Sequence, residues 1–181
     1  MVKVYRKLNE ITEYWEAWDD SVDLIFHWGS VGDKGETSKL PLTDRPRARE
    51  VFEREKKRLI AEGFMPVKIE NMAQVVIQYR IDGMGSVKDL DKEQVIEELM
   101  NECLGWTGLG NCDGHDIGSG TLNIFCDVVD GPASEQIIID CLRENGQLEG
   151  AVIARRERVG DESYFVFWPK NFAGGFDLIY R

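Results

Sequence analysis

The fold of the first third of this chain is decided by Trp28-Gly29-Ser30-Val31-Gly32-Asp33-Lys34-Gly35-Glu36. Three glycines stand in this stretch, and each can take a positive φ without steric cost, so we expect a tight hairpin here. The hairpin joins a predicted strand at 23–28 to another at 37–42. Upstream, the alternating run at 2–8 and the segment at 13–18 are also predicted strands, separated from 23–28 by a turn cluster at 19–21.

A helix is predicted directly after these strands, at about 45–62. Thr43 or Asp44 suits its N-cap, and Pro46 suits its first turn. Gly63 is expected to end it. The residues at helical spacing on one face, apolar apart from the glutamate, are Ala48, Val51, Phe52, Glu55 and Leu59. The first part of the chain should therefore be one helix against a small antiparallel sheet.

This order of elements resembles the WGR domain, a small module named for Trp-Gly-Arg and found in poly(ADP-ribose) polymerases and in bacterial proteins. The family pattern is an aromatic strand, then W-G-R-[IV]-G-x-x-G-[QE], a helix and a Gly-aromatic pair, which Gly63-Phe64 matches here. Ser30 stands where the family has arginine. In the polymerases the Trp and Arg belong to the DNA-contacting surface. The resemblance implies a WGR-like fold for residues 1–66 and a recognition surface around Trp28.

Charge is distributed unevenly along the 181 residues, whose net charge is −11. Residues 1–66 hold 12 Lys and Arg against 13 Asp and Glu, whereas the remainder holds 10 against 20. An acidic second half repels a phosphate backbone. The shift in charge lies close to Pro66, so we place a domain boundary between Met65 and Ala73 and expect domains at 1–66 and 73–181.

The composition is that of a globular chain, with 43% hydrophobic and 30% charged residues. No window approaches the roughly 18 apolar residues of a membrane span, and the first residues lack a signal-peptide core. We therefore expect a cytoplasmic, bacterial-type protein that does not contact a membrane, with its four cysteines as reduced thiols.

The second half predicts an α+β domain with the order βαβαββ. Its strands are expected at 74–81, 121–129, 151–158 and 164–168. One helix follows Asp89 or Asp91 and the other opens at Pro132. The glycine-rich stretch 105–120 is interpreted as an irregular connection, and the tail at 172–180 as a segment that docks back as an added strand. With both helices on one face of a mainly antiparallel sheet, this is a ferredoxin-like α/β sandwich.

A second resemblance concerns the segment Asp116-Ile117-Gly118-Ser119-Gly120-Thr121-Leu122-Asn123-Ile124. A glycine-rich loop that runs into an amphipathic strand in this way is similar to small uncharacterised bacterial α/β domains. No activity comes with this resemblance.

Five residues of the first domain are candidates for binding. Trp28 could stack on a sugar or base, or it could fill the small core. Ser30 offers one hydroxyl where the family has a guanidinium fork, and Lys34 could supply a cation nearby. Arg45 and Arg49 begin a run of helix cations that extends to position 58.

Those helix cations allow two interpretations. They could form a footprint for phosphate groups. Interleaved glutamates favour a solvated, self-paired face instead, with expected i, i+4 pairs Glu50–Arg54 and Glu53–Lys57.

The candidate metal ligands in the sequence are Cys103, Cys112, Asp113, His115 and Asp116. Cys112-x-x-His115 has ligand-compatible spacing, but zinc typically takes ligands from two such paired sets and no second set exists. Calcium requires a denser run of oxygen ligands that ends in glutamate. We therefore assign no metal ligand, cofactor or catalytic residue from the sequence.

Three functions follow, in order of preference. The first is a non-enzymatic binding or adaptor protein with an unidentified protein partner, which it recognises through its WGR-like module. The second is weak nucleic-acid binding through the same module. The third is a metal-dependent enzyme built on the loop from Cys112 to Asp116.

Overall fold

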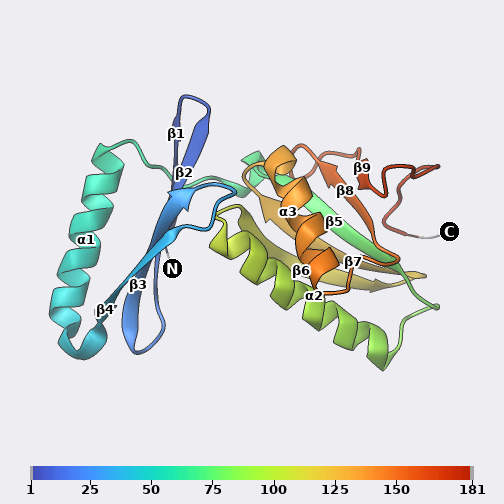
Figure 1. The fold of residues 1–181 in the computed structure, drawn as a ribbon, viewed down its shortest axis with the longest axis horizontal. Coiled ribbons are helices and arrows are strands. Elements are labelled where there is room, and N and C mark those ends of the chain that lie inside the picture. Colours follow the sequence, from blue (N-terminus) through green and yellow to red (C-terminus); the bar gives the residue numbers. More distant parts are fainter. Residues whose placement is uncertain (1, 180–181) are drawn as a thin grey trace. The chain divides into compact units, whose positions relative to one another are not determined.

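A computed structural model describes residues 2–179 of the chain. The protein is mixed α+β, with two antiparallel sheets and three α-helices among the described residues (Figure 1). It divides into two compact units. The first runs to Val67 and includes Trp106–Gly108, and the second comprises Lys68–Gly105 and the chain from Leu109 onward.

The first unit contains a four-stranded sheet in the order β1-β2-β3-β4, with every neighbouring pair antiparallel. The strands are β1 (Val2–Leu8), β2 (Ile11–Asp19), β3 (Asp23–Ser30) and β4 (Glu36–Pro41). All four were predicted, with ends that differ by at most two residues.

The connection between β3 and β4 lies within the stretch 29–36 where the sequence predicted a hairpin. Its innermost pair is Trp28 with Glu36. Gly32 takes a φ of +96°, as expected. The backbones of Gly29 and Gly35 pass so close that a Cβ on Gly29 would lie 2.9 Å from the Gly35 Cα. The glycines therefore allow a close approach across the loop as well as a turn.

Helix α1 (Arg45–Ala61) follows a short 3-10 turn, η1 (Leu42–Asp44). The Asp44 side chain accepts a hydrogen bond from the Arg47 amide at 3.1 Å, which confirms the predicted cap. At the other end Gly63 takes a φ of +89° and the Phe64 amide donates to the Leu59 carbonyl at 2.9 Å. The helix thus ends where the sequence predicted.

The core of the first unit lies between α1 and one face of its sheet. Ala48 and Leu59 are the buried residues of the helix. The cluster they join consists of Val4, Trp15, Ala17, Leu24, Phe26, Ala48, Leu59 and Phe64. Beyond the helix, reciprocal 2.8 Å backbone hydrogen bonds join Met65 to Tyr5 of β1. The predicted apolar stripe of α1 is therefore the face that packs on the sheet.

The second unit contains a five-stranded sheet in the order β6-β7-β5-β8-β9, again with antiparallel neighbours. After the short 3-10 turn η2 (Ile69–Asn71), its elements are β5 (Ala73–Arg80), α2 (Val87–Trp106), β6 (Gly110–Gly118), β7 (Thr121–Val128), α3 (Gly131–Glu144), β8 (Val152–Arg156) and β9 (Phe165–Trp168). Both helices lie on one face of the sheet, because the Cys103 and Cys141 thiols contact the Ile137 and Leu99 carbonyls of the facing helix, each at 3.9 Å.

The strand β6 corrects the prediction of an irregular connection at 105–120. It pairs with β7 along its length, interrupted by a bulge between Cys112 and Gly114. Its glycines hid the strand pattern, and at least one of them serves close packing: a Cβ on Gly110 would overlap the Asp127 carbonyl oxygen. With β6 included, the order of elements is βαββαββ, not βαβαββ.

The tail docks on the sheet, but its described residues form no added strand. The Asp177 carbonyl accepts a hydrogen bond from the Gln78 side chain at 2.9 Å. The Leu178 carbonyl accepts from the Thr121 and Asn123 side chains, also at 2.9 Å. Hydrogen bonds from side chains of the sheet thus replace the strand-to-strand backbone hydrogen bonds that we expected. Tyr180, the last residue of the predicted segment, lies outside the described residues. Within residues 2–179, no helix combines the length and apolar character needed to cross a membrane.

Candidate recognition pocket

The first unit has a cavity of about 550 Å³ between α1 and the sheet. This recognition pocket has an aromatic and aliphatic part formed by Trp15, Phe26, Trp28, Val51, Leu59 and Phe64. Its charged part is formed by Arg6, Glu13, Glu55, Arg58 and Glu62. Apolar walls with a few polar groups at the rim are typical of ligand pockets, whose volumes are roughly 300–1,000 Å³.

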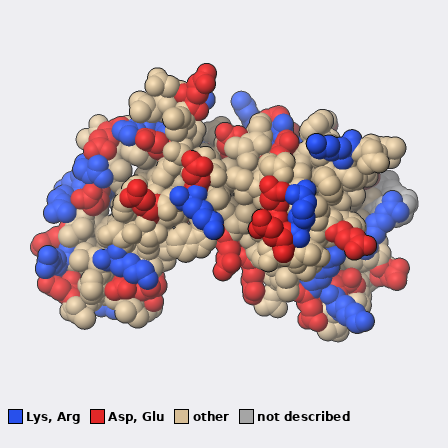
Figure 2. Space-filling model, viewed as in Figure 1, with Lys and Arg blue, Asp and Glu red and all other residues tan. Residues whose placement is uncertain are grey.

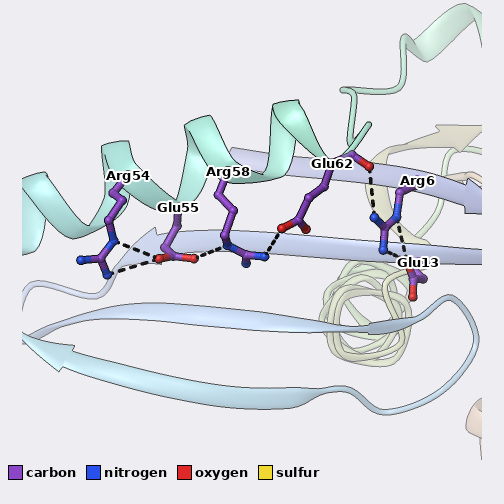
Figure 3. Close-up of polar contacts among 6 residues, drawn as sticks. All are labelled: Arg6, Glu13, Arg54, Glu55, Arg58 and Glu62. Atoms are coloured by element: carbon purple, nitrogen blue, oxygen red, sulfur yellow. Dashed lines mark hydrogen bonds and ion pairs between the residues drawn. The ribbon is translucent and has the colours of Figure 1, made fainter.

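The side of the pocket along α1 carries a row of alternating charges (Figure 3). Glu55 is its centre. One Glu55 oxygen lies 3.3 Å from Arg54, and the other accepts from the Arg58 Nε at 2.9 Å. Arg58 also donates to the Glu62 carboxylate at 2.7 Å. The bond from Arg58 holds the pKa of the Glu55 carboxyl below its usual value, despite the opposing effect of burial.

Arg6 of β1 continues this row onto the sheet (Figure 3). Its Nη1 donates to the Glu62 carbonyl at 3.0 Å, and its Nε and Nη2 donate to one Glu13 oxygen at 2.9 and 2.6 Å. The guanidinium also lies 4.6 Å from the centre of the Phe64 ring. Arg6 therefore connects the helix end, strand β2 and the aromatic part of the pocket.

These contacts differ from the i, i+4 pairs that the sequence predicted. Glu55, the exception on the apolar stripe, is the shared acceptor for Arg54 and Arg58, in place of Glu50–Arg54 and Glu53–Lys57. The reason is position: Glu55 faces the pocket, where its side chain is only 24% exposed, and the two guanidiniums reach over to it. The general expectation of a self-paired face is met for this part of the helix.

The structure separates the five predicted binding residues. Trp28 and Ser30 both line the recognition pocket. Lys34 is exposed in the β3–β4 loop. Arg45 and Arg49 line a different cavity of about 340 Å³, at the first turns of α1. The predicted residues thus belong to at least two surfaces of the first unit.

Sequence reasoning missed Arg6 and Glu13 as pocket residues. They are direct cross-strand neighbours in β1 and β2. Opposite charges on two consecutive predicted strands, 2–8 and 13–18, were the signal that could have found them. Their place in the same pocket as Trp28 depends on the sheet register, which cannot be read from the sequence.

The other face of the same sheet carries a buried network of polar side chains. The His27 imidazole is 1% exposed, with Nδ1 2.7 Å from Glu16 Oε1 and Nε2 2.9 Å from the Tyr14 hydroxyl. Lys3 lies 3.1 Å from the other Glu16 oxygen. Burial, with the Glu16 charge as second cause, raises the pKa of Tyr14 to about 12. The burial of this polar network and the raised pKa of its tyrosine favour a structural role over a catalytic one.

The Cys112–Asp116 segment belongs to β6 of the second unit. Cys112 is buried opposite Cys126 of β7 and its thiol donates to the Phe125 carbonyl at 3.2 Å. His115 is partly exposed and its Nδ1 faces α2, where Glu93 is the nearest carboxylate. The thiol and the imidazole therefore have separate partners, and Cys103 contacts α3.

Neither charge sign forms a continuous patch over α1 on the face shown in Figure 2, where acidic and basic side chains alternate.

Comparison of the chain with family models, with curated proteins and with solved structures finds no match.

Proposed function

We propose that this chain is a non-enzymatic binding or adaptor protein whose first unit holds a segment of a partner protein in the recognition pocket. The observation that carries the proposal is the combination of an aromatic interior with a rim of paired charges of both signs. Trp28 and Ser30, the positions at the end of β3 on which the WGR resemblance rests, line this pocket.

A protein segment suits the pocket better than a phosphate backbone. Arg6 and Arg58 are each already bonded to carboxylates, and a phosphate would have to displace them. It would also approach Glu13, which lines the same pocket. A peptide with an apolar anchor and its own mixed charges can fill the aromatic part and leave these ion pairs in place.

We further infer that the second unit is a ferredoxin-like α/β sandwich with one added strand. The support is the order βαββαβ from β5 to β8, with both helices on one face, followed by β9. This inference concerns architecture and assigns the unit no activity.

The test is selection from a random peptide library on the full chain and on two variants. Ser38→Trp places an indole in the pocket from an exposed position of β4, whereas Thr37→Trp places the same group on the opposite face of that strand. We expect enriched peptides with an aromatic or aliphatic anchor that bind the wild type and Thr37→Trp and bind Ser38→Trp at least about tenfold more weakly. No enrichment, or equal binding to both variants, would contradict a peptide-binding pocket.

A further inference from the structure

Three ionisable side chains of the second unit converge where α2 packs on β6. Glu93 and Glu97 are one helical turn apart on α2, so their carboxylates lie on the same face. His115 projects from β6 toward them, with its Nδ1 2.8 Å from Glu93 Oε1 and 3.6 Å from Glu97 Oε2. One ligand atom from each residue lies within 4.8 Å of the other two.

Glu93 is the residue that sets this cluster apart from an ordinary surface group. It is only 7% exposed, and its Oε1 is buried without a hydrogen-bond partner. The His115 Nδ1 is close enough to count as an ion pair, but the contact lacks the angles of a hydrogen bond. A buried carboxylate oxygen left in this way is costly unless a cation or donor satisfies it.

A second carboxylate makes the electrostatics less favourable still. Burial, followed by the adjacent Glu97 carboxyl, raises the pKa of Glu93, and the nearby His115 only partly offsets this. A divalent ion would satisfy both carboxylates at once.

We propose that Glu93, Glu97 and His115 form a binding site for a divalent transition-metal ion such as Zn²⁺. Donors at about 2.0–2.1 Å from a tetrahedral ion lie roughly 3.3 Å apart, and the two distances from His115 lie on either side of that value. Three protein ligands leave one coordination position open.

The choice of metal follows from the ligands. Imidazole suits zinc and its neighbours, whereas calcium and magnesium prefer shells made of oxygen alone. Cys112 is close in sequence but is not a member of this set. This ligand set differs from the Cys112-x-x-His115 pair in the sequence, because helix α2 supplies the partners of His115.

Isothermal titration of the untagged, chelator-treated full chain with ZnCl₂ tests the site, with MgCl₂ as a parallel titration. We expect one equivalent of Zn²⁺ to bind, and Mg²⁺ to bind at least about tenfold more weakly. Glu93→Gln, Glu97→Gln and His115→Ala should each weaken Zn²⁺ binding at least about tenfold. Glu98→Gln, an exposed residue of the same helix, should leave it unchanged.

A further variant separates this site from thiol ligation by the free cysteines. Cys112→Ser should retain Zn²⁺ binding, and Co²⁺ in the wild type should give a visible d–d spectrum without thiolate charge-transfer bands. Thermal melts of each variant without metal check folding; the half-exposed Glu97 and His115 are the sites most tolerant of substitution. Absence of Zn²⁺ binding, its persistence in the folded Glu97 and His115 variants, or its loss in Cys112→Ser would overturn the proposal.

Discussion

His27 Nδ1 lies 2.7 Å from Glu16 Oε1 inside the first unit, and both side chains are almost fully buried. Lys3 lies 3.1 Å from the second Glu16 oxygen, so one carboxylate has two cationic or donor neighbours. Removing such a carboxylate leaves both neighbours without their acceptor, and the loss of one member of a buried pair costs about 3–5 kcal/mol.

Glu16→Leu should therefore lower the free energy of unfolding of the first unit by about 3 kcal/mol. Urea unfolding followed by tryptophan fluorescence measures it. The matched change in the same strand is Glu13→Leu, whose ion pair with Arg6 is partly exposed and should cost about 1 kcal/mol or less. Equal losses of unfolding free energy in the two variants would show that the buried polar network does not support the sheet.

Tyr14 makes the stability that this polar network contributes depend on pH in the alkaline range. Its pKa is raised to about 12 by burial and then by Glu16, whereas an unfolded tyrosine titrates near 10. The native state therefore retains the proton more strongly, and the stability from this shift is full below pH 10 and is lost as the pH rises toward 12.

The stability advantage of the wild type over Tyr14→Phe should accordingly shrink by about 2 kcal/mol between pH 9 and pH 12. Urea titrations of both proteins at several pH values provide the comparison. Burial raises the pKa of Tyr79 equally in both proteins, and it is also the largest cause of the raised pKa of Tyr5, to which Tyr14 adds only a smaller effect, so most of these other contributions cancel. A constant difference over this range would mean that the Tyr14 hydroxyl is not held protonated by the fold.

Helix α1 was predictable from the sequence because its signals are local. Asp44 caps it and Gly63 ends it, and each of these residues acts on the backbone within a few positions. Strand β6 was not predictable in this way. Its glycines are read as a loop until β7 is placed beside it, because Gly110 meets the Asp127 backbone of that neighbour.

The candidate sites show the same limit. Trp28 was found because it belongs to a motif that is contiguous in sequence. The pairing of Arg6 with Glu13 needs the sheet register, and the meeting of Glu93 with His115 needs α2 to pack on β6. Long-range contacts of this kind leave no periodic signal in either segment.

Gly35 provides a test of the close approach in the β3–β4 loop. A Cβ at this position would overlap the Tyr14 hydroxyl and the Trp28 carbonyl oxygen, and the backbone oxygen cannot move aside freely. Gly35→Ala should therefore lower the free energy of unfolding of the first unit by about 2 kcal/mol or more. Gly105→Ala is the opposite case: it lies in α2 with nothing within 4 Å of the added Cβ, and should stabilise by about 0.5–1 kcal/mol. Thermal or urea unfolding distinguishes these signs, and a neutral Gly35→Ala would contradict the tight loop.

Binding to DNA should be weak. Arg6, Arg54 and Arg58 already contact carboxylates, and the chain from residue 67 holds 20 acidic against 10 basic residues, so few phosphate contacts can form. Fluorescence anisotropy with a nicked duplex at about 50 mM salt should give a dissociation constant no tighter than roughly micromolar, near the non-specific range. Trp28→Ala should leave that weak binding unchanged, because contacts from exposed cations do not involve the indole. Nanomolar binding that is lost in Trp28→Ala would instead make the recognition pocket a nucleic-acid surface and put the second function ahead of the peptide-binding one.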